Sequence, residues 1–170
     1  DARVSKKISA QMTYNGSDVD TVFAMLTDPN YVTAKNEGTG GKDVAVEVVP
    51  EGRDGVKIVV SRVLPAQIPG FAKKFVGETI DTTETDNWGA ANSDDSRDGL
   101  ISVDFGSAPI AINGTLRLES SGTGTVLKVD VEVKAGVPLV GGKLEGVAAD
   151  QFQRAVNKEQ EIGLEWLASS

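Results

Sequence analysis

The residues of this 170-residue chain that could carry out chemistry are carboxylates and phenols, because the sequence contains neither cysteine nor histidine. Their absence excludes thiolate nucleophiles, Cys-ligated metal sites, the Ser-His-Asp triad and imidazole bases. A general base would therefore have to be a carboxylate or a tyrosine. Glu84, Tyr31 and Tyr14 are the candidates, and they define an enzyme as one hypothesis.

Two glutamates fall close to apolar faces of predicted elements. Glu84 is in phase with Ile80, Thr82 and Trp88 along a predicted strand, so its side chain would point inward. A buried carboxylate needs a partner or a raised pKa, and it could anchor an amine or a hydroxyl of a ligand. The alternative is that Glu84 lies near the end of its strand, where its carboxylate is in contact with water. Glu159 lies beside the apolar stripe of a C-terminal helix, where we expect it to reach water.

Two short strings resemble cofactor or metal motifs but lack required residues. Residues 40–43 (GGKD) miss the first glycine of a phosphate-binding loop and its Ser or Thr after the lysine. Residues 94–99 match the first half of a calcium loop, but Phe105 stands where the bidentate glutamate should be. The sequence therefore predicts no cofactor and no metal.

The charge balance argues against nucleic acid as a partner. The chain has 17 basic and 25 acidic residues, a net charge of -8, and no basic stripe with interleaved aromatic residues. No segment approaches the roughly 18–20 apolar residues that cross a bilayer, and the first residues are not followed by the apolar run that a signal peptide contains. We expect a single domain over residues 1–170 that lies in the cytoplasm.

The hydrophobic pattern predicts the elements that must position these groups. Residues 3–14 alternate with period two, typical of a half-buried strand. Short helices are predicted over residues 19–26 and 29–36, and about six strands follow between residues 44 and 134. The clearest alternation, residues 127–134, indicates an antiparallel sheet covered on one face only.

The last segment changes to helical periodicity and supplies the cover. A helix over residues 143–167 would be roughly 37 Å long, and a ten-residue strand spans roughly 33 Å. One helix can therefore cross the sheet from edge to edge.

This order of elements resembles the helix-grip fold of the START-like superfamily, also called SRPBCC or Bet v 1-like. Several segments are similar to an actinobacterial family of unknown function, DUF2505. The resemblance spans nearly the whole chain and implies an α+β fold, in which a curved antiparallel sheet of six to seven strands wraps around a long C-terminal helix. The segments are residues 22–31 (VFAMLTDPNY), 63–65 (VLP), 84–89 (ETDNWG), 137–145 (VPLVGGKLE) and 165–168 (EWLA).

The resemblance implies a cavity for a small hydrophobic or lipid-like ligand between the sheet and the last helix. Small or polar residues on inward-facing rows would leave it unfilled, namely Ala10, Thr82, Gly114, Ala148, Ala155 and Gly163. Two alternatives stay open: a cyclase-like or hydrolase-like enzyme, and an interaction module with a vestigial cavity. The predicted cavity residues are Ile80, Thr82, Glu84, Ile101, Val103, Phe105, Ile112, Leu116, Val129, Val131, Phe152 and Val156.

An apolar, proline-containing segment over residues 65–75 is the candidate gate of that cavity. Ile68, Phe71 and Phe75 stand beside Lys73 and Lys74, a combination that suits a mobile gate or a transient membrane contact. The alternative is a loop that fills the core and leaves its lysines in solvent.

Overall fold

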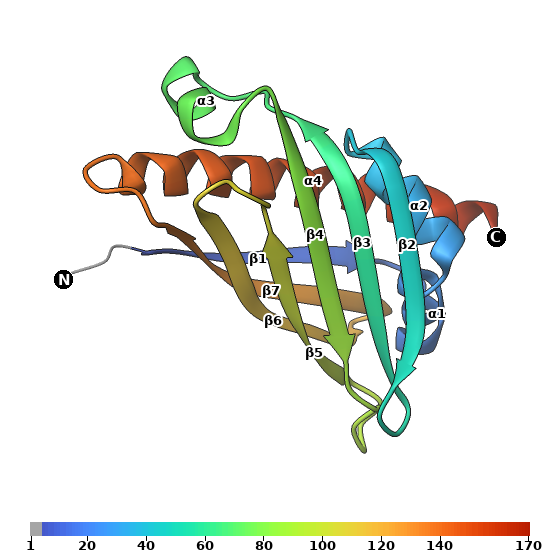
Figure 1. Ribbon diagram of the computed structural model, residues 1–170. Coiled ribbons are helices and arrows are strands. Elements are labelled where there is room, and N and C mark those ends of the chain that lie inside the picture. Colours follow the sequence, from blue (N-terminus) through green and yellow to red (C-terminus); the bar gives the residue numbers. More distant parts are fainter. Residues whose placement is uncertain (1–4) are drawn as a thin grey trace.

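Seven antiparallel strands and four helices make up the part of the chain that a computed structural model describes, residues 5–170 (Figure 1). Residues 3 and 4, which the first alternation included, lie outside it. The neighbour order in the sheet is β1-β7-β6-β5-β4-β3-β2. In chain order the elements are β1 (Ser5–Tyr14), α1 (Val19–Leu26), α2 (Pro29–Gly38), β2 (Lys42–Glu51), β3 (Gly55–Pro65), α3 (Gly70–Val76), β4 (Thr79–Trp88), β5 (Arg97–Asp104), β6 (Ile110–Ser121), β7 (Gly124–Ala135) and α4 (Gly141–Ser169).

The period-two pattern of the strands places one apolar row of each on the inner face of the sheet. On β7, the buried residues Val129 and Val131 pair with Ala10 and Ile8 of β1, which belong to the same row. The polar residues between them face solvent, as an antiparallel sheet covered on one side requires. The predicted fold class, a curved antiparallel sheet with a long C-terminal helix, is confirmed.

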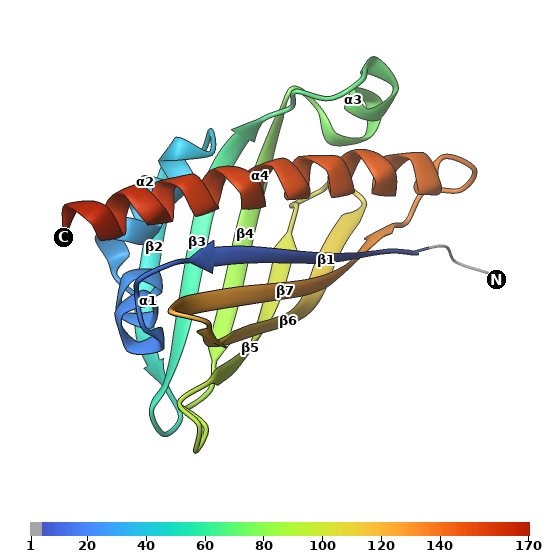
Figure 2. The same ribbon diagram turned by 180° about the vertical axis from the view of Figure 1, so that it is seen from behind.

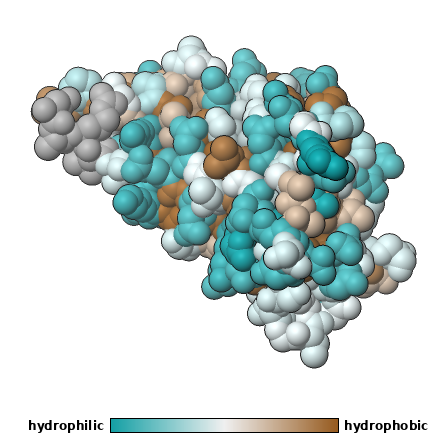
Figure 3. Space-filling model, turned by 90° about the horizontal axis from the view of Figure 1, so that it is seen from below, coloured by the Kyte–Doolittle hydropathy of each residue, from teal (hydrophilic) through white to brown (hydrophobic). Residues whose placement is uncertain are grey.

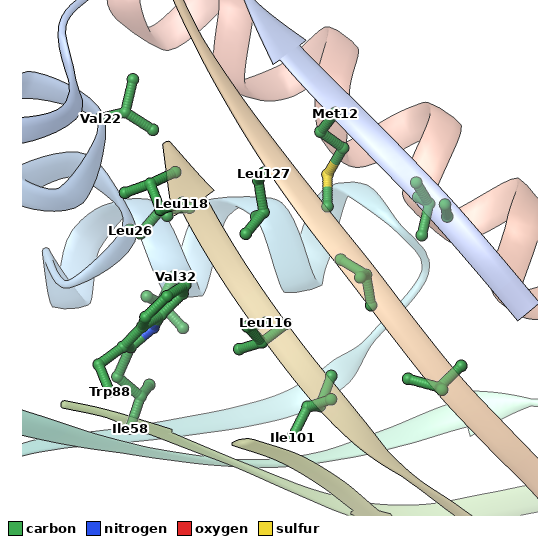
Figure 4. Close-up of a cluster of buried hydrophobic side chains, with 14 of the residues drawn as sticks. Met12, Val22, Leu26, Val32, Ile58, Trp88, Ile101, Leu116, Leu118 and Leu127 are labelled. Atoms are coloured by element: carbon green, nitrogen blue, oxygen red, sulfur yellow. The ribbon is translucent and has the colours of Figure 1, made fainter. Parts of the chain in front are cut away.

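Helices α1 and α2 close one end of the sheet. Each begins at an aspartate that caps its first turn: Asp18 Oδ1 accepts from Thr21 N at 2.8 Å, and Asp28 Oδ1 accepts from Asn30 N at 2.8 Å. Pro29 occupies the first turn of α2, where its missing N–H costs nothing. Figure 4 shows the side chains of these helices meeting those of the sheet, among them Leu26, Val32 and Trp88.

Helix α4 crosses the inner face of the sheet from the α3 end to the α2 end (Figure 2). Near its start, Glu145 Oε2 accepts from Ala135 N at 2.9 Å, and near its end, Gln160 Oε1 accepts from Thr13 N at 2.7 Å. Both bonds join the helix to the β1–β7 side of the sheet. The helix is therefore fixed at two points on that side, and its middle spans the sheet.

Two of the small residues expected to leave space do the opposite. A Cβ at Gly114 would overlap the carbonyl of Asp130, so this glycine serves the close approach of β6 and β7. A Cβ at Gly163 would lie 2.7 Å from Tyr14 Cε1 and 3.0 Å from the Tyr31 hydroxyl. The cavity interpretation of these two residues was wrong, because both sit where the packing is tightest.

The outer surface is mostly polar on the face shown in Figure 3, where hydrophobic residues form only small, separate patches. Within residues 5–170, none of the helices combines the length and the apolar character that crossing a bilayer requires.

Candidate functional site

A cavity of about 190 Å³ lies between the inner face of the sheet and α4. A single water molecule needs roughly 10–15 Å³ of such space, so several waters or a small ligand can be accommodated. Strands β3 to β7 supply one wall, and Val156, Ala155 and Phe152 of α4 supply the opposite wall. Ala148 and Ala155 line this space, as expected for small residues on the helix.

The structure brings most of the predicted cavity residues together around this space. Thr82 and Val131 are exceptions, since both are buried but neither lines the cavity. Thr82 Oγ1 donates to the backbone oxygen of Arg62 at 3.4 Å, and Val131 packs within the core. Ala10 is also buried without lining it. The ten residues that do line it are Ile80, Glu84, Ile101, Val103, Phe105, Ile112, Leu116, Val129, Phe152 and Val156.

The exposed members of the cavity wall all lie at the α3 end. They are Pro65, Gln67 and Gln151, and Gln151 Nε2 donates to the Gln67 backbone oxygen at 3.3 Å. A shallow surface depression adjoins them. This end therefore provides the mouth of the cavity, with one hydrogen bond joining the segment before α3 to α4.

The three predicted gate residues are half-buried at this mouth. Ile68 lines the cavity, together with Ala72 of α3. Phe71 and Phe75 do not line it and instead pack in a small apolar cluster with Ala72, Ala135 and Leu144. The lysine of α4 nearest this cluster, Lys143, places Nζ 5.9 Å from the centre of the Phe71 ring. The segment thus covers one end of the cavity and rests on the first turns of α4.

The opposite end of the cavity holds a group of charged side chains, the buried charge cluster. Its members are Lys35 of α2, Arg62 of β3, Glu84 and Asp86 of β4, and Glu159 of α4, and all five line the cavity. Two strands of the sheet and two helices therefore converge on one charged site in a mostly apolar space.

Arg62 and Glu84 form the central ion pair of this cluster. Arg62 Nη1 lies 3.5 Å from Glu84 Oε1 and donates a hydrogen bond to Asn36 Oδ1 at 2.7 Å. Burial would raise the pKa of Glu84, but Arg62 and then Lys35 more than offset it, and the pKa is lowered. Glu84 is therefore an ionised, paired carboxylate.

Asp86 lies two residues further along the same face of the strand, and its pKa is shifted in the opposite direction to that of Glu84. Burial, followed by the nearby charge of Glu84, raises the pKa of Asp86 well above its usual range. Its Oδ1 is buried without a hydrogen-bond partner among the described residues. Of these two carboxyl groups, Asp86 is therefore the one that keeps its proton more tightly, beside an ionised Glu84.

Glu159 differs from the expectation that it reaches water. Its side chain is 22% exposed, lines the cavity and lies 4.0 Å from Lys35 Nζ. Burial raises the pKa of Glu159 more than Lys35 lowers it. Burial would lower the pKa of Lys35, but Glu159 and then Tyr31 raise it above its ordinary value. Lys35 therefore remains a cation.

The two tyrosines proposed as general bases do not line the cavity. Tyr14 and Tyr31 are buried in the core beside Gly163, and the Tyr31 ring packs edge-on against Trp166 at 5.3 Å between centres. Burial raises the pKa of Tyr31 to about 12 and that of Tyr14 higher still, so both remain neutral phenols. Of the three candidate bases, only Glu84 faces the cavity.

Three residues of the site were not predicted, Lys35, Arg62 and Asp86, although the sequence pattern held a signal for two of them. Arg62 continues the inward row of Ile58 and Val60, and Asp86 lies midway between Glu84 and Trp88 in the same phase. Following each strand's alternation through its polar residues would have placed both on the inner face. Lys35 gave no such signal, because α2 has little hydrophobic periodicity.

The chain is similar throughout its length to known proteins. An uncharacterised protein of Mycobacterium tuberculosis (strain H37Rv) is 25% identical over 171 residues, covering 92% of this chain and 94% of that protein. The crystal structure of TTHA0849 from Thermus thermophilus matches with a TM-score of 0.61 and 16% identity, covering 97% of this chain and 100% of that one. The crystal structure of human STARD10 matches with a TM-score of 0.64 and 11% identity, covering 98% of this chain and 66% of that one.

The two structural matches show a shared fold, which is the START-like helix-grip fold expected from the order of elements. The model of one family, described as protein of unknown function (DUF2505), matches residues 9–167, from the first strand to the end of the last helix. The chain therefore belongs to the DUF2505 family.

Proposed function

We propose that this protein binds a small hydrophobic or amphipathic molecule, such as a lipid, in the cavity between the sheet and α4. The observation that supports the proposal is the cavity itself: about 190 Å³, mostly apolar, with charged groups at one end and a mouth at the other. Binding sites for small molecules commonly combine apolar walls with a few polar groups that fix orientation. Transport and sensing both fit such binding.

The size of the cavity sets the expected affinity. An eight-carbon chain would gain roughly 6 kcal/mol from burial at about 0.8 kcal/mol per methylene. Association costs at least about 4 kcal/mol of translational and rotational freedom. Burial alone therefore supports weak binding, and tighter binding requires a polar contact at the buried charge cluster.

Fluorescence of the neutral dye N-phenyl-1-naphthylamine tests this function. We expect the dye to bind the wild type, and Ala155→Phe, which projects a ring into the cavity, to weaken binding roughly tenfold or more. Ala168→Phe adds the same ring at an exposed position of α4 and is the matched control. Equal dye binding by the wild type and Ala155→Phe would overturn the cavity as the site.

Native mass spectrometry of protein purified from its source organism is the second test. We expect a co-purifying mass of lipid size, and we expect Ala155→Phe to lose it. A protein that carries no such mass and takes up nothing from a lipid extract would argue against the proposed function.

We also propose a transient membrane contact at the mouth of the cavity. Leu139 is fully exposed and has a φ of 70°, a conformation that L residues rarely adopt. Lys143 lies close by on α4, and Lys73 and Lys74 lie on α3. We expect flotation with vesicles of phosphatidylglycerol and phosphatidylcholine, reduced by Leu139→Asp. Unchanged flotation of that variant would contradict the contact.

The cytoplasm remains the compartment we propose, because a chain without cysteine is suited to a reducing environment. Fractionation of source cells followed by immunoblotting tests this, and recovery of the protein outside the cytoplasmic fraction would contradict it.

A further inference from the structure

The buried charge cluster has one negative group more than it has positive groups. Lys35 and Arg62 supply two cations, and Glu84, Asp86 and Glu159 supply three carboxyl groups. The tyrosines behind Lys35 are neutral and do not change this balance. Full ionisation would leave one uncompensated negative charge in a space largely removed from water, which is costly.

The excess carboxyl group is Asp86, because the other two carboxylates already have cations. Arg62 lies 3.5 Å from Glu84, and Lys35 lies 4.0 Å from Glu159. Asp86 has no cation within salt-bridge distance in the described part of the chain, and its Oδ1 is buried without a donor. It also lines the cavity, so a molecule bound there reaches it.

We propose that Asp86 anchors the ammonium group of an amphipathic amine whose apolar part fills the cavity, an inference that rests on the proposed function. The ammonium group supplies the missing positive charge and the missing hydrogen-bond donor at one position. A carboxylate ligand would instead add a fourth negative group beside cations that are already paired. A neutral alcohol would satisfy the oxygen but leave the charge balance unchanged.

The proton balance of this binding follows from the charges that face Asp86. Glu84 on its own strand, Glu159 on α4, and the cations Lys35 on α2 and Arg62 on β3 surround it. Without ligand, Asp86 holds a proton at pH values below its raised pKa. When the ammonium group binds, that proton leaves for solvent and the carboxylate pairs with the ligand. Amine affinity therefore rises with pH until Asp86 is ionised without ligand.

Three ligands with the same tail test the anchor: octylamine, octanol and octanoate. We expect calorimetry to show octylamine binding roughly ten- to a hundredfold more tightly than octanol, and octanoate binding more weakly than either. Repeating the titrations in buffers of different ionisation enthalpy measures the protons. We expect octylamine to release up to about one proton per molecule bound, and octanol to release none.

Asp86→Asn separates this anchor from the cavity. We expect the variant to lose the preference for octylamine over octanol, together with proton release, while it still binds octanol. Asp81→Asn, at an exposed position on the opposite face of β4, is the matched control and should keep the preference. If Asp86→Asn does not fold, the wild-type proton release and its pH dependence decide the question.

The outcomes distinguish the two proposals. Octanol that binds as tightly as octylamine, without proton release, overturns the amine anchor and leaves the cavity function standing. Failure of all three ligands to bind, together with failure of the dye, overturns the proposed function itself. A preference for octanoate would also overturn the anchor, because it would show that the cluster accepts a further negative charge.

Discussion

The guanidinium of Arg62 lies 3.5 Å from the carboxylate of Glu84, on neighbouring strands that both face the cavity. Their side chains are only 13% and 17% exposed, so water contributes little to the solvation of either charge. Arg62 also donates to Asn36 of α2, which connects the pair to the helix that closes this end of the fold. The pair is therefore both part of the candidate site and part of the packing.

Removing the charge of Arg62 from this pair should strongly destabilise the protein. Arg62→Met leaves Glu84 buried without its cation, and we expect a loss of roughly 3–5 kcal/mol in the free energy of unfolding, measured with urea. Arg53→Met, at an exposed position, is the control and should change stability by less than about 0.5 kcal/mol.

The double variant Arg62→Met with Glu84→Gln removes both charges. We expect it to recover much of the loss, because the larger cost comes from a buried charge left unpaired. If Arg62→Met were as stable as the wild type, the pair would have no structural role. The same would follow if the double variant lost more free energy of unfolding than Arg62→Met and Glu84→Gln lose together.

Asp86 should make the protein less stable as the pH rises. Its pKa is raised in the folded state, so folded protein binds more protons than unfolded protein above about pH 4, the ordinary range of aspartate. The contribution of Asp86 to stability is therefore fully present below its pKa in the unfolded chain, and it is lost as the pH rises through its pKa in the folded protein. The lowered pKa of Glu84 acts in the opposite direction, adding stability that is lost on acidification.

Replacing Asp86 with asparagine isolates its contribution. We expect Asp86→Asn to gain stability relative to the wild type as the pH increases from about 4 to 8, measured by urea unfolding at each pH. The exposed Asp81→Asn variant provides the comparison. A stability difference between wild type and Asp86→Asn that stays constant with pH would show that the pKa of Asp86 is not raised in the folded state.

The sequence predicted the order of the strands and helices because most of these elements carry their own hydrophobic periodicity. Alternation on β7 and the helical stripe of α4 placed Val129 and Val156 on the buried faces without any knowledge of their partners. Together with the resemblance to the helix-grip fold, this pattern named twelve cavity residues, of which ten line the cavity and two, Thr82 and Val131, do not. Periodicity says which face of an element a side chain occupies, but not whether that part of the face borders the cavity or the packed core.

The polar part of the site could not be predicted in the same way. Lys35 reaches the cavity from a helix with little periodicity, and it meets Glu159, far away in the sequence, only because α2 packs on α4. Gly114 and Gly163 were misjudged for a related reason, since a small residue marks either an empty space or a close approach. Only the position of the neighbouring backbone or ring distinguishes the two.

Replacing either of two glycines of α4 with alanine should change thermal stability, in opposite directions for the two positions. At Gly163 the new methyl group would meet Tyr14 at 2.7 Å, and overpacking of about 1–3 kcal/mol outweighs the gain of about 1 kcal/mol in helix propensity. Gly163→Ala should therefore lower the midpoint of thermal unfolding. At Gly146 nothing lies within 4 Å of the added Cβ, so Gly146→Ala should raise it. Stabilisation by both variants would show that the packing between α4 and the tyrosines is loose.

Gln151 should control how fast ligands exchange through the mouth of the cavity. Its side chain donates to the Gln67 backbone oxygen at 3.3 Å and so holds the segment before α3 against α4. An exposed hydrogen bond of this kind contributes roughly 0.5–1 kcal/mol, so Gln151→Ala should release the dye about two- to fivefold faster. Stopped-flow fluorescence measures this rate. Gln153→Ala removes a similar bond, from Gln153 to Asn157 along the helix, and should leave the rate unchanged. Equal release rates in the two variants would place the route of exchange elsewhere.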